Sequence, residues 1–200
     1  MSTMIKLLLC FVTLVLVGCQ SAPPVPADKY YRLEAVSGEA SARTILSEAI
    51  FIAPLRADGL YAERAMLYAP AAQPRELQQY HYQNWMEPPR VLLQEHIRAS
   101  LEAMAIAPHV TDIASGAGAG YVLNAKILRL EKITDGSKTR AVVSLHFALQ
   151  RTKSSELILE HSYSAEVVLS DDTQHAYVLA CEAGLKKIYA SFAEDLKSLK

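Results

Sequence analysis

Three long segments in the second half of the chain alternate between apolar and polar residues. They span residues 121–133, 140–151 and 156–170. A period of two is typical of β-strands with one buried and one exposed face. The short polar stretches between them, at 135–136 and 153–155, suit the tight turns of β-hairpins. The sequence therefore predicts an antiparallel meander of three strands.

Two helical patterns complete the predicted domain. The first follows Pro88 and Pro89, which suit the start of a helix. The second covers 173–199 with a continuous apolar stripe, and Asp171, followed three residues later by Gln174, predicts its N-cap. Shorter strands are expected at 29–34, 48–53, 64–68 and 77–85. We therefore expect an α+β fold, a two-layer sandwich of an antiparallel sheet with two helices on one face.

The N-terminus resembles an export signal that ends in a lipidation site. Lys6 precedes an apolar run at 7–17, which is long enough for the core of a signal peptide and too short to span a membrane. The run ends in Leu16-Val17-Gly18-Cys19, which resembles the lipobox of bacterial lipoproteins. We expect removal of the signal peptide 1–18 by cleavage between Gly18 and Cys19. A diacylglycerol and an N-acyl chain would then be attached to Cys19.

A tether is predicted at 19–28, ahead of a single domain at 29–200. Its prolines favour an extended conformation that would hold the domain on the order of 25 Å from the membrane. In the bacterial sorting rule for lipoproteins, Asp after the lipidated cysteine retains the protein in the inner membrane. Because Gln20 follows Cys19, we expect a protein of the outer membrane of a Gram-negative bacterium that faces the periplasm.

Neither charge nor motifs indicate an enzyme or a nucleic-acid-binding protein. The 20 Lys and Arg residues balance 21 Asp and Glu residues, for a formal net charge of −1. The glycine-rich stretch at 115–120 lacks the Lys-Ser or Lys-Thr of a phosphate-binding loop. The histidines show no metal-ligand spacing, and Cys181 lies in an apolar stripe, where a packed thiol is expected. We expect no catalytic residues, no metal and no cofactor beyond the acyl chains on Cys19.

Aromatic residues concentrate between positions 61 and 85, where Trp85 is the only tryptophan of the chain. Alternation would place Tyr80 and Tyr82 on one face of their strand and Trp85 on the other. In one interpretation, Trp85 packs over the first helix and the tyrosines fill a face of the sheet. In the other, part of the surface formed by Tyr68, Tyr80, Tyr82 and Trp85 contacts another protein, because Tyr and Trp supply large, stiff contact area.

The order of several motifs resembles the family of ABC-type transport auxiliary lipoproteins. The lipobox is followed by Tyr30-Tyr31-Arg32-Leu33, by residues 64–68, by Asn84-Trp85-Met86-Glu87-Pro88-Pro89 before a helix, by Leu128-Arg129-Leu130-Glu131 late in a strand, and by an apolar terminal helix. The resemblance implies an outer-membrane component of a system that moves lipid between two membranes. Its implied partners are a substrate-binding protein of the MCE class and, through it, an inner-membrane permease and ATPase. The family supplies no catalytic residues.

Two functions of different classes remain open from the sequence. The first is a docking protein at the outer membrane without enzymatic activity. A closed ring of copies would suit this docking role, and we expect self-association through the aromatic segment. The alternative is a periplasmic lipid-binding module that holds acyl chains between helices and sheet, or a lipoprotein of another envelope assembly machine. A hydrolase is disfavoured because no nucleophile is paired with a base.

Overall fold

A computed structural model of the chain describes residues 24–35, 44–113 and 118–199. The predicted signal peptide, the cleavage site at Gly18 and Cys19, and part of the glycine-rich stretch lie outside these residues. Within the described part of the chain, no helix combines the length and hydrophobicity needed to cross a membrane.

The predicted meander forms one side of the sheet, with its last strand at the edge. Its strands are β7 (Tyr121–Thr134), β8 (Arg140–Arg151) and β9 (Leu157–Val168), and β8 pairs antiparallel with both of its neighbours. Alternate residues of β8 form part of the core, since Leu145, Phe147 and Leu149 are each 0% exposed. The alternation in the sequence therefore located these strands and their buried face correctly.

The rest of the sheet departs from the prediction. The remaining strands are β1 (Lys29–Tyr31), β2 (Ile50–Ile52), β3 (Arg56–Ala57), β4 (Ala65–Pro70), β5 (Gln78–Trp85) and β6 (Val110–Thr111). Strands β2, β3 and β4 pair in turn with successive parts of β7, and all three run parallel to it. β1 is parallel to β5, β6 is parallel to β2, and β5 is antiparallel to β4. The sheet is mixed, so the predicted purely antiparallel sheet is wrong. Parallel pairing joins segments that are distant in the sequence, and alternation within each strand does not reveal it.

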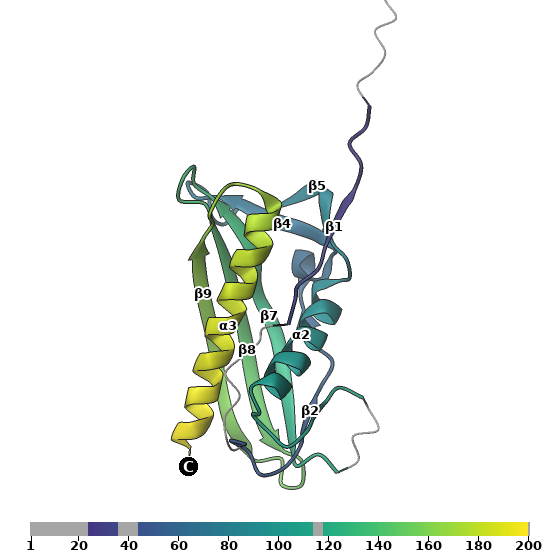
Figure 1. Ribbon diagram of the computed structural model, residues 1–200, viewed down its shortest axis with the longest axis vertical. Coiled ribbons are helices and arrows are strands. Elements are labelled where there is room, and N and C mark those ends of the chain that lie inside the picture. The colour runs from purple at the N-terminus through teal and green to yellow at the C-terminus, as the bar shows by residue number, and fades with distance from the viewer. Residues whose placement is uncertain (1–23, 36–43, 114–117, 200) are drawn as a thin grey trace, which may run out of the picture.

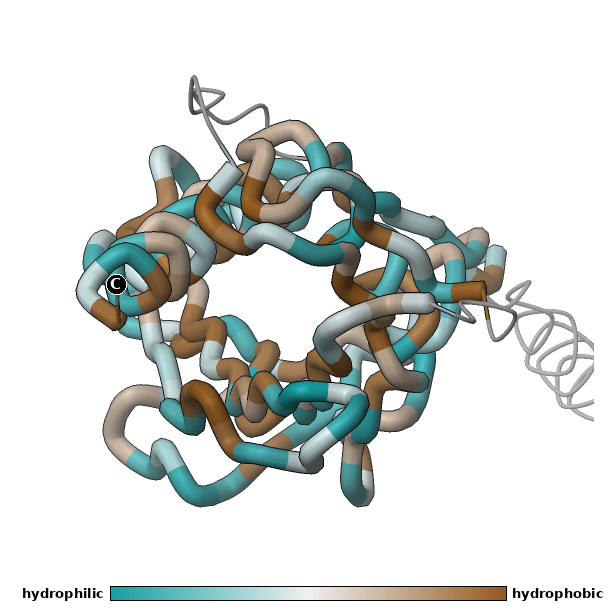
Figure 2. Tube along the Cα trace, turned by 90° about the horizontal axis from the view of Figure 1, so that it is seen from below, coloured by the Kyte–Doolittle hydropathy of each residue, from teal (hydrophilic) through white to brown (hydrophobic). Residues whose placement is uncertain are grey.

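The sheet curls into a half-barrel, and helices close its open side (Figure 1). The helices are α2 (Pro89–Ala103) and α3 (Gln174–Ser198), with a 3₁₀ turn η1 (Gly59–Ala62) between β3 and β4. Seen along the long axis, strands and helices form a ring around a common interior (Figure 2). The α+β class holds, whereas a curled sheet replaces the predicted flat sandwich.

Aromatic side chains fill the space between α3 and the meander. The ring of Phe147 on β8 lies with its centroid 5.0 Å from that of Phe192 on α3 and 5.8 Å from that of Tyr163 on β9. Tyr177 and Tyr189 of α3 are both 0% exposed. Burial of this apolar surface is the main stabilising contribution of the helix.

The N-cap of α3 lies two residues after the predicted one. The side chain of Thr173 accepts a hydrogen bond from the backbone N–H of Ala176 at 3.1 Å, which makes Thr173 the N-cap. Asp171, predicted to be the cap, instead accepts a hydrogen bond from the Thr173 N–H at 2.8 Å. Asp171 therefore fixes the capping residue and does not cap the helix itself.

Candidate interaction surfaces

The aromatic segment is divided between core and surface. Trp85 is 1% exposed, and its ring centroid lies 6.0 Å from that of Tyr177 on α3. A partner cannot reach an enclosed indole, so the predicted partner contact is wrong for Trp85. Tyr82 is 37% exposed, whereas Tyr68 and Tyr80 are half-buried with ring centroids 4.5 Å apart. Of the predicted contact residues, only Tyr82 is well exposed.

An irregularity in β5 explains why alternation failed here. Ala65 of β4 pairs with Asn84, whereas Leu67 pairs with Gln79. Two steps along β4 thus correspond to five steps along β5, which breaks the period of two between these pairs. Tyr80 and Trp85 were predicted on opposite faces, yet both pack on the same core.

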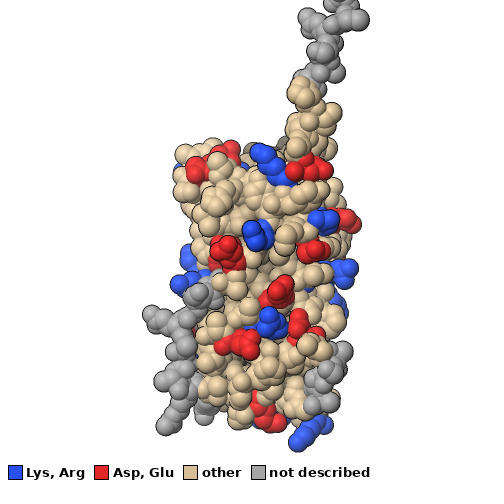
Figure 3. Space-filling view, turned by 45° about the vertical axis from the view of Figure 1, so that its right-hand side comes forward, with Lys and Arg blue, Asp and Glu red and all other residues tan. Residues whose placement is uncertain are grey.

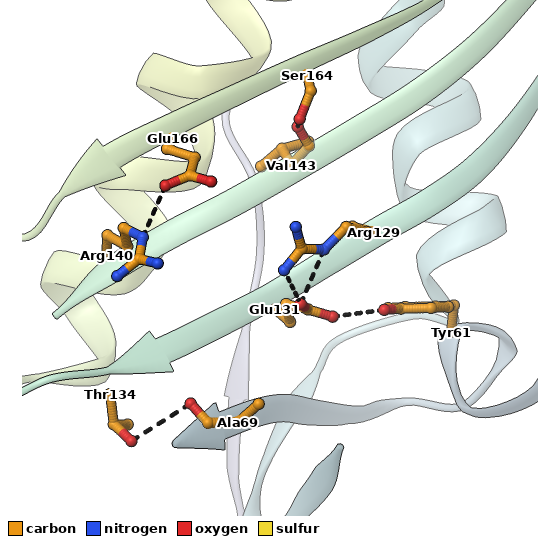
Figure 4. Close-up of polar contacts among 9 residues, drawn as sticks. All are labelled: Tyr61, Ala69, Arg129, Glu131, Thr134, Arg140, Val143, Ser164 and Glu166. Atoms are coloured by element: carbon orange, nitrogen blue, oxygen red, sulfur yellow. Dashed lines mark hydrogen bonds and ion pairs between the residues drawn. The ribbon is translucent and has the colours of Figure 1, made fainter. Parts of the chain in front are cut away.

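A buried carboxylate beside this segment is fully occupied by hydrogen bonds. Glu131 on β7 is 2% exposed; one of its oxygens accepts from the Arg129 guanidinium and the other from the Tyr61 hydroxyl (Figure 4). Burial and the hydrogen bond to Glu131 raise the pKa of Tyr61 above its ordinary value. Because neither oxygen is open to a substrate, the group fixes η1 against β7 and does not suit a general base.

The buried thiol is equally unsuited to chemistry. Cys181 is 0% exposed, and burial raises its pKa to about 12, so the thiol stays protonated and unreactive. Among the described residues, no group of three or more His, Cys, Asp or Glu side chains is arranged to hold a metal ion.

The chain that follows β1 runs along the seam between α2 and α3 (Figure 1). Leu33 is 9% exposed and belongs to the core. His96 of α2 lies with Nε2 2.9 Å from the carbonyl oxygen of Glu34 and Nδ1 2.9 Å from the hydroxyl of Tyr189 on α3. A carbonyl only accepts, so Nε2 donates and Nδ1 accepts from the hydroxyl. The Glu34 N–H donates to the Glu182 carboxylate of α3 at 2.8 Å. The N-terminal chain is therefore attached to both helices.

A groove lies beside this chain, between β1 and the first half of α3. This β1–α3 groove has a volume of about 290 Å³, and its lining includes Tyr30, Arg32 and Leu179. Tyr30 is 56% exposed and Leu179 is 49% exposed. The guanidinium of Arg64 lies 5.3 Å from the centroid of the Tyr30 ring. Figure 3 shows a band of surface without Lys, Arg, Asp or Glu just below the point where the N-terminal chain leaves the domain.

A second hollow lies at the opposite end of the molecule, near the C-terminus of α3. This distal hollow has a volume of about 550 Å³, and Leu46, Leu196 and Leu199 provide apolar lining. The guanidinium of Arg151 lies 5.4 Å from the ring centroid of Tyr121 at its border. Arg151 also forms ion pairs with carboxylates, at 3.9 Å to Glu48 and 3.4 Å to Glu156.

Neither hollow was predicted from the sequence, because each joins segments that are far apart in the chain. The β1–α3 groove combines residues 30–34 with residues 175–182, and the distal hollow combines residues 44–47 with residues 196–199. A weak signal for the groove was present in Tyr30 and Leu179, apolar residues that the predicted core did not use.

Comparison with known proteins assigns both family and fold. A family model described as the ABC-type transport auxiliary lipoprotein component matches residues 31–193. Among curated protein sequences, none matches this chain significantly.

Several solved structures share the fold. A protein from Xanthomonas campestris has 19% identity and a TM-score of 0.71, covering 82% of this chain and 92% of its own. An uncharacterized protein has 15% identity and a TM-score of 0.69, covering 86% and 99%. A hypothetical protein from Chlamydia trachomatis has 11% identity and a TM-score of 0.51, covering 76% and 99%. At these identities the likeness shows the fold alone.

Proposed function

This chain belongs to the family of ABC-type transport auxiliary lipoproteins, and from that premise we propose that it is a docking component of a lipid transport system, without enzymatic activity of its own. The acylated Cys19 anchors it in the outer membrane, with the domain in the periplasm. Its protein partner is an MCE-class substrate-binding protein, and through it an inner-membrane permease and ATPase. The observation that carries the proposal is the family match over residues 31–193.

The arrangement of the titratable side chains supports a docking function. The buried Glu131 carboxylate has both oxygens hydrogen-bonded, and the buried Cys181 thiol has its pKa raised to about 12. These groups stabilise the fold and are closed to a substrate. We do not place acyl chains between the helices and the sheet, because Phe147, Tyr163 and Phe192 already occupy that space.

The test is affinity purification of the full-length lipoprotein, tagged after Lys200, from membranes in mild detergent. We expect an MCE-class protein and a permease to copurify with the wild type. Cys19→Ala removes the acyl chains, so this variant should leave the membrane fraction and lose the complex. If the functional wild type repeatedly copurifies no component of an ABC system, the docking function is rejected.

Gln20→Asp is the matched control for the anchor. By the sorting rule, this variant keeps its acyl chains and is retained in the inner membrane, so it separates lipidation from location. We expect mass spectrometry to find acylated Cys19 in this variant. Membrane fractionation should find the variant protein in the inner membrane. Wild-type protein in the inner membrane fraction would contradict the proposed outer-membrane location.

A further inference from the structure

We propose that the β1–α3 groove contacts the surface of a phospholipid bilayer. Tyr30 and Leu179 would reach the headgroup region, and Lys29 and Arg32 would face lipid phosphates. The proposal rests on the proposed function, because it takes the acyl anchor on Cys19 as given.

The exposed side chains at this end suit an interface between water and lipid. Tyr30 and Leu179 line the groove, and Met86, which is 46% exposed, donates its N–H to the carbonyl of the lining residue Tyr31 at 2.7 Å. Tyrosine has an apolar ring and a polar hydroxyl, a combination enriched where one end of a side chain is in lipid and the other in water. Exposed leucine adds affinity through the apolar area that it buries.

The groove lining contains one cation, Arg32, and two carboxylates, and Lys29 of β1 lies directly before the lining residue Tyr30. Lys29 and Arg32 are exposed, and within the described part of the chain no carboxylate lies at ion-pair distance from either. The carboxylates that line the groove belong to Glu34 and Glu182. Glu182 lies three residues beyond Leu179 along α3 and accepts the hydrogen bond from the Glu34 N–H. The unpaired cations therefore remain available to lipid phosphates, which attract lysine and arginine.

The position of the groove brings it close to the membrane. Residues 24–28 are exposed and leave the domain directly ahead of Lys29 (Figure 1). The tether from Cys19 to Lys29 reaches about 30 Å when extended, which sets the greatest distance of the domain from the bilayer, and the groove reaches the headgroups when the tether lies along the membrane surface. A second contact made by an already anchored molecule is favoured by its high effective concentration. Weak contacts from a few side chains are then sufficient to orient the domain.

The only tryptophan provides the measurement. Trp85 pairs with Tyr31 of β1, so its position reports the position of the groove. The full-length acylated protein is reconstituted into vesicles of phosphatidylethanolamine and phosphatidylglycerol that contain a small fraction of dansyl-labelled lipid. Energy transfer from Trp85 to the dansyl group then measures how often the groove lies on the bilayer.

The matched variants are Leu179→Ala and Leu199→Ala, which lie at opposite ends of α3 and are 49% and 54% exposed in the wild type. Leu179→Ala should lower the ratio of docked to undocked protein about fivefold, the effect of losing roughly half of a leucine burial. Arg32→Ser should also lower the ratio of docked to undocked protein, and this decrease should be larger at low salt than at high salt. Leu199→Ala should leave energy transfer unchanged.

Each other outcome contradicts a specific statement. Equal energy transfer in Leu179→Ala and wild type, with acylated Cys19 verified by mass spectrometry, overturns the membrane contact and leaves the docking function intact. If the wild type is found unacylated and does not remain on vesicles, the protein has no acyl anchor. The proposed function is then rejected together with the membrane contact. If Leu179→Ala keeps its energy transfer but loses the copurified MCE-class protein, the groove binds protein and the membrane proposal is wrong.

Discussion

His96 is the residue at which the N-terminal chain and both helices meet. It is 3% exposed, with Nε2 facing the Glu34 carbonyl and Nδ1 facing the Tyr189 hydroxyl. Burial lowers its pKa from 6.5 to about 4, and the hydrogen bond to the Glu34 carbonyl opposes this shift only in part. The neutral ring therefore holds the three segments together at neutral pH.

We predict that acid weakens the fold through this histidine. The unfolded chain takes up a proton near pH 6.5, whereas the folded protein takes it up only near pH 4. Stability is therefore fully present above pH 6.5 and falls as the pH decreases towards 4, by up to about 3 kcal/mol. Urea unfolding followed by Trp85 fluorescence between pH 7.5 and pH 4.5 measures the loss. His96→Gln should flatten the dependence of the unfolding free energy on pH. His81→Gln, which replaces an exposed strand residue, should not. The same pH dependence in the wild type and both variants would contradict the prediction.

The sequence singled out no histidine from the six, and the reason is distance along the chain. Tyr189 lies 93 residues after His96, and Glu34 lies 62 residues before it. Spacing within a helix shows that His96 flanks an apolar stripe, but the partners that bury it come from other elements. By contrast, the packed thiol of Cys181 was predictable, because its surroundings are set by its own stripe.

At the scale of elements, α3 contains a glycine that its packing does not require. A glycine within a helix can mark a close approach to a neighbouring element, and Gly184 lies on the side of α3 that faces the meander. A Cβ at this position would lie 3.5 Å from Cγ2 of Val143 and 3.7 Å from Cβ of Ala165, which is ordinary van der Waals contact. Glycine therefore lowers the stability of the helix without a compensating contact.

We predict that Gly184→Ala stabilises the protein by about 1 kcal/mol, because alanine favours the helix and its methyl group fits. Urea unfolding at pH 7.5 measures the difference. Gly136→Ala provides the control: this glycine has φ of 52°, where an L side chain is strained. The same substitution there should destabilise the protein by about 1 kcal/mol. If Gly184→Ala destabilises the fold, α3 lies closer to the meander than the 3.5 Å contact with Val143 allows.

Elements were predictable wherever local alternation or a stripe persisted, and were missed where it was interrupted. The bounds of β8 agree with the predicted 140–151, and α3 lies within one residue of the predicted 173–199 at either end. The two-residue strands β3 and β6 are too short to show a period. In β5, the register shift opposite β4 removed the alternation on which the placement of Trp85 depended.

At the scale of the whole molecule, the parallel pairings give the domain two distinct ends. Strands β2, β3 and β4 divide the edge of β7 among them, so β1 and β5 gather at the end where the N-terminal chain leaves (Figure 1). The distal hollow lies at the other end, beside the C-terminus of α3. The 25 residues of α3 make it about 37 Å long. A domain that rests on the bilayer at the β1–α3 groove would therefore present the distal hollow to the periplasm.

This orientation predicts different neighbours for the two ends. A photo-reactive benzophenone amino acid is placed at Leu199 or at Leu179 in the full-length lipoprotein, and crosslinks are formed in living cells. At Leu199 we expect capture of an MCE-class protein, because this end faces away from the membrane. At Leu179 we expect capture of phospholipid, because this end contacts the headgroups. Both sites are exposed leucines, Leu179 within α3 and Leu199 at its C-cap. Capture of the same protein at both sites would show that the partner encloses the domain, and the upright orientation would then be wrong.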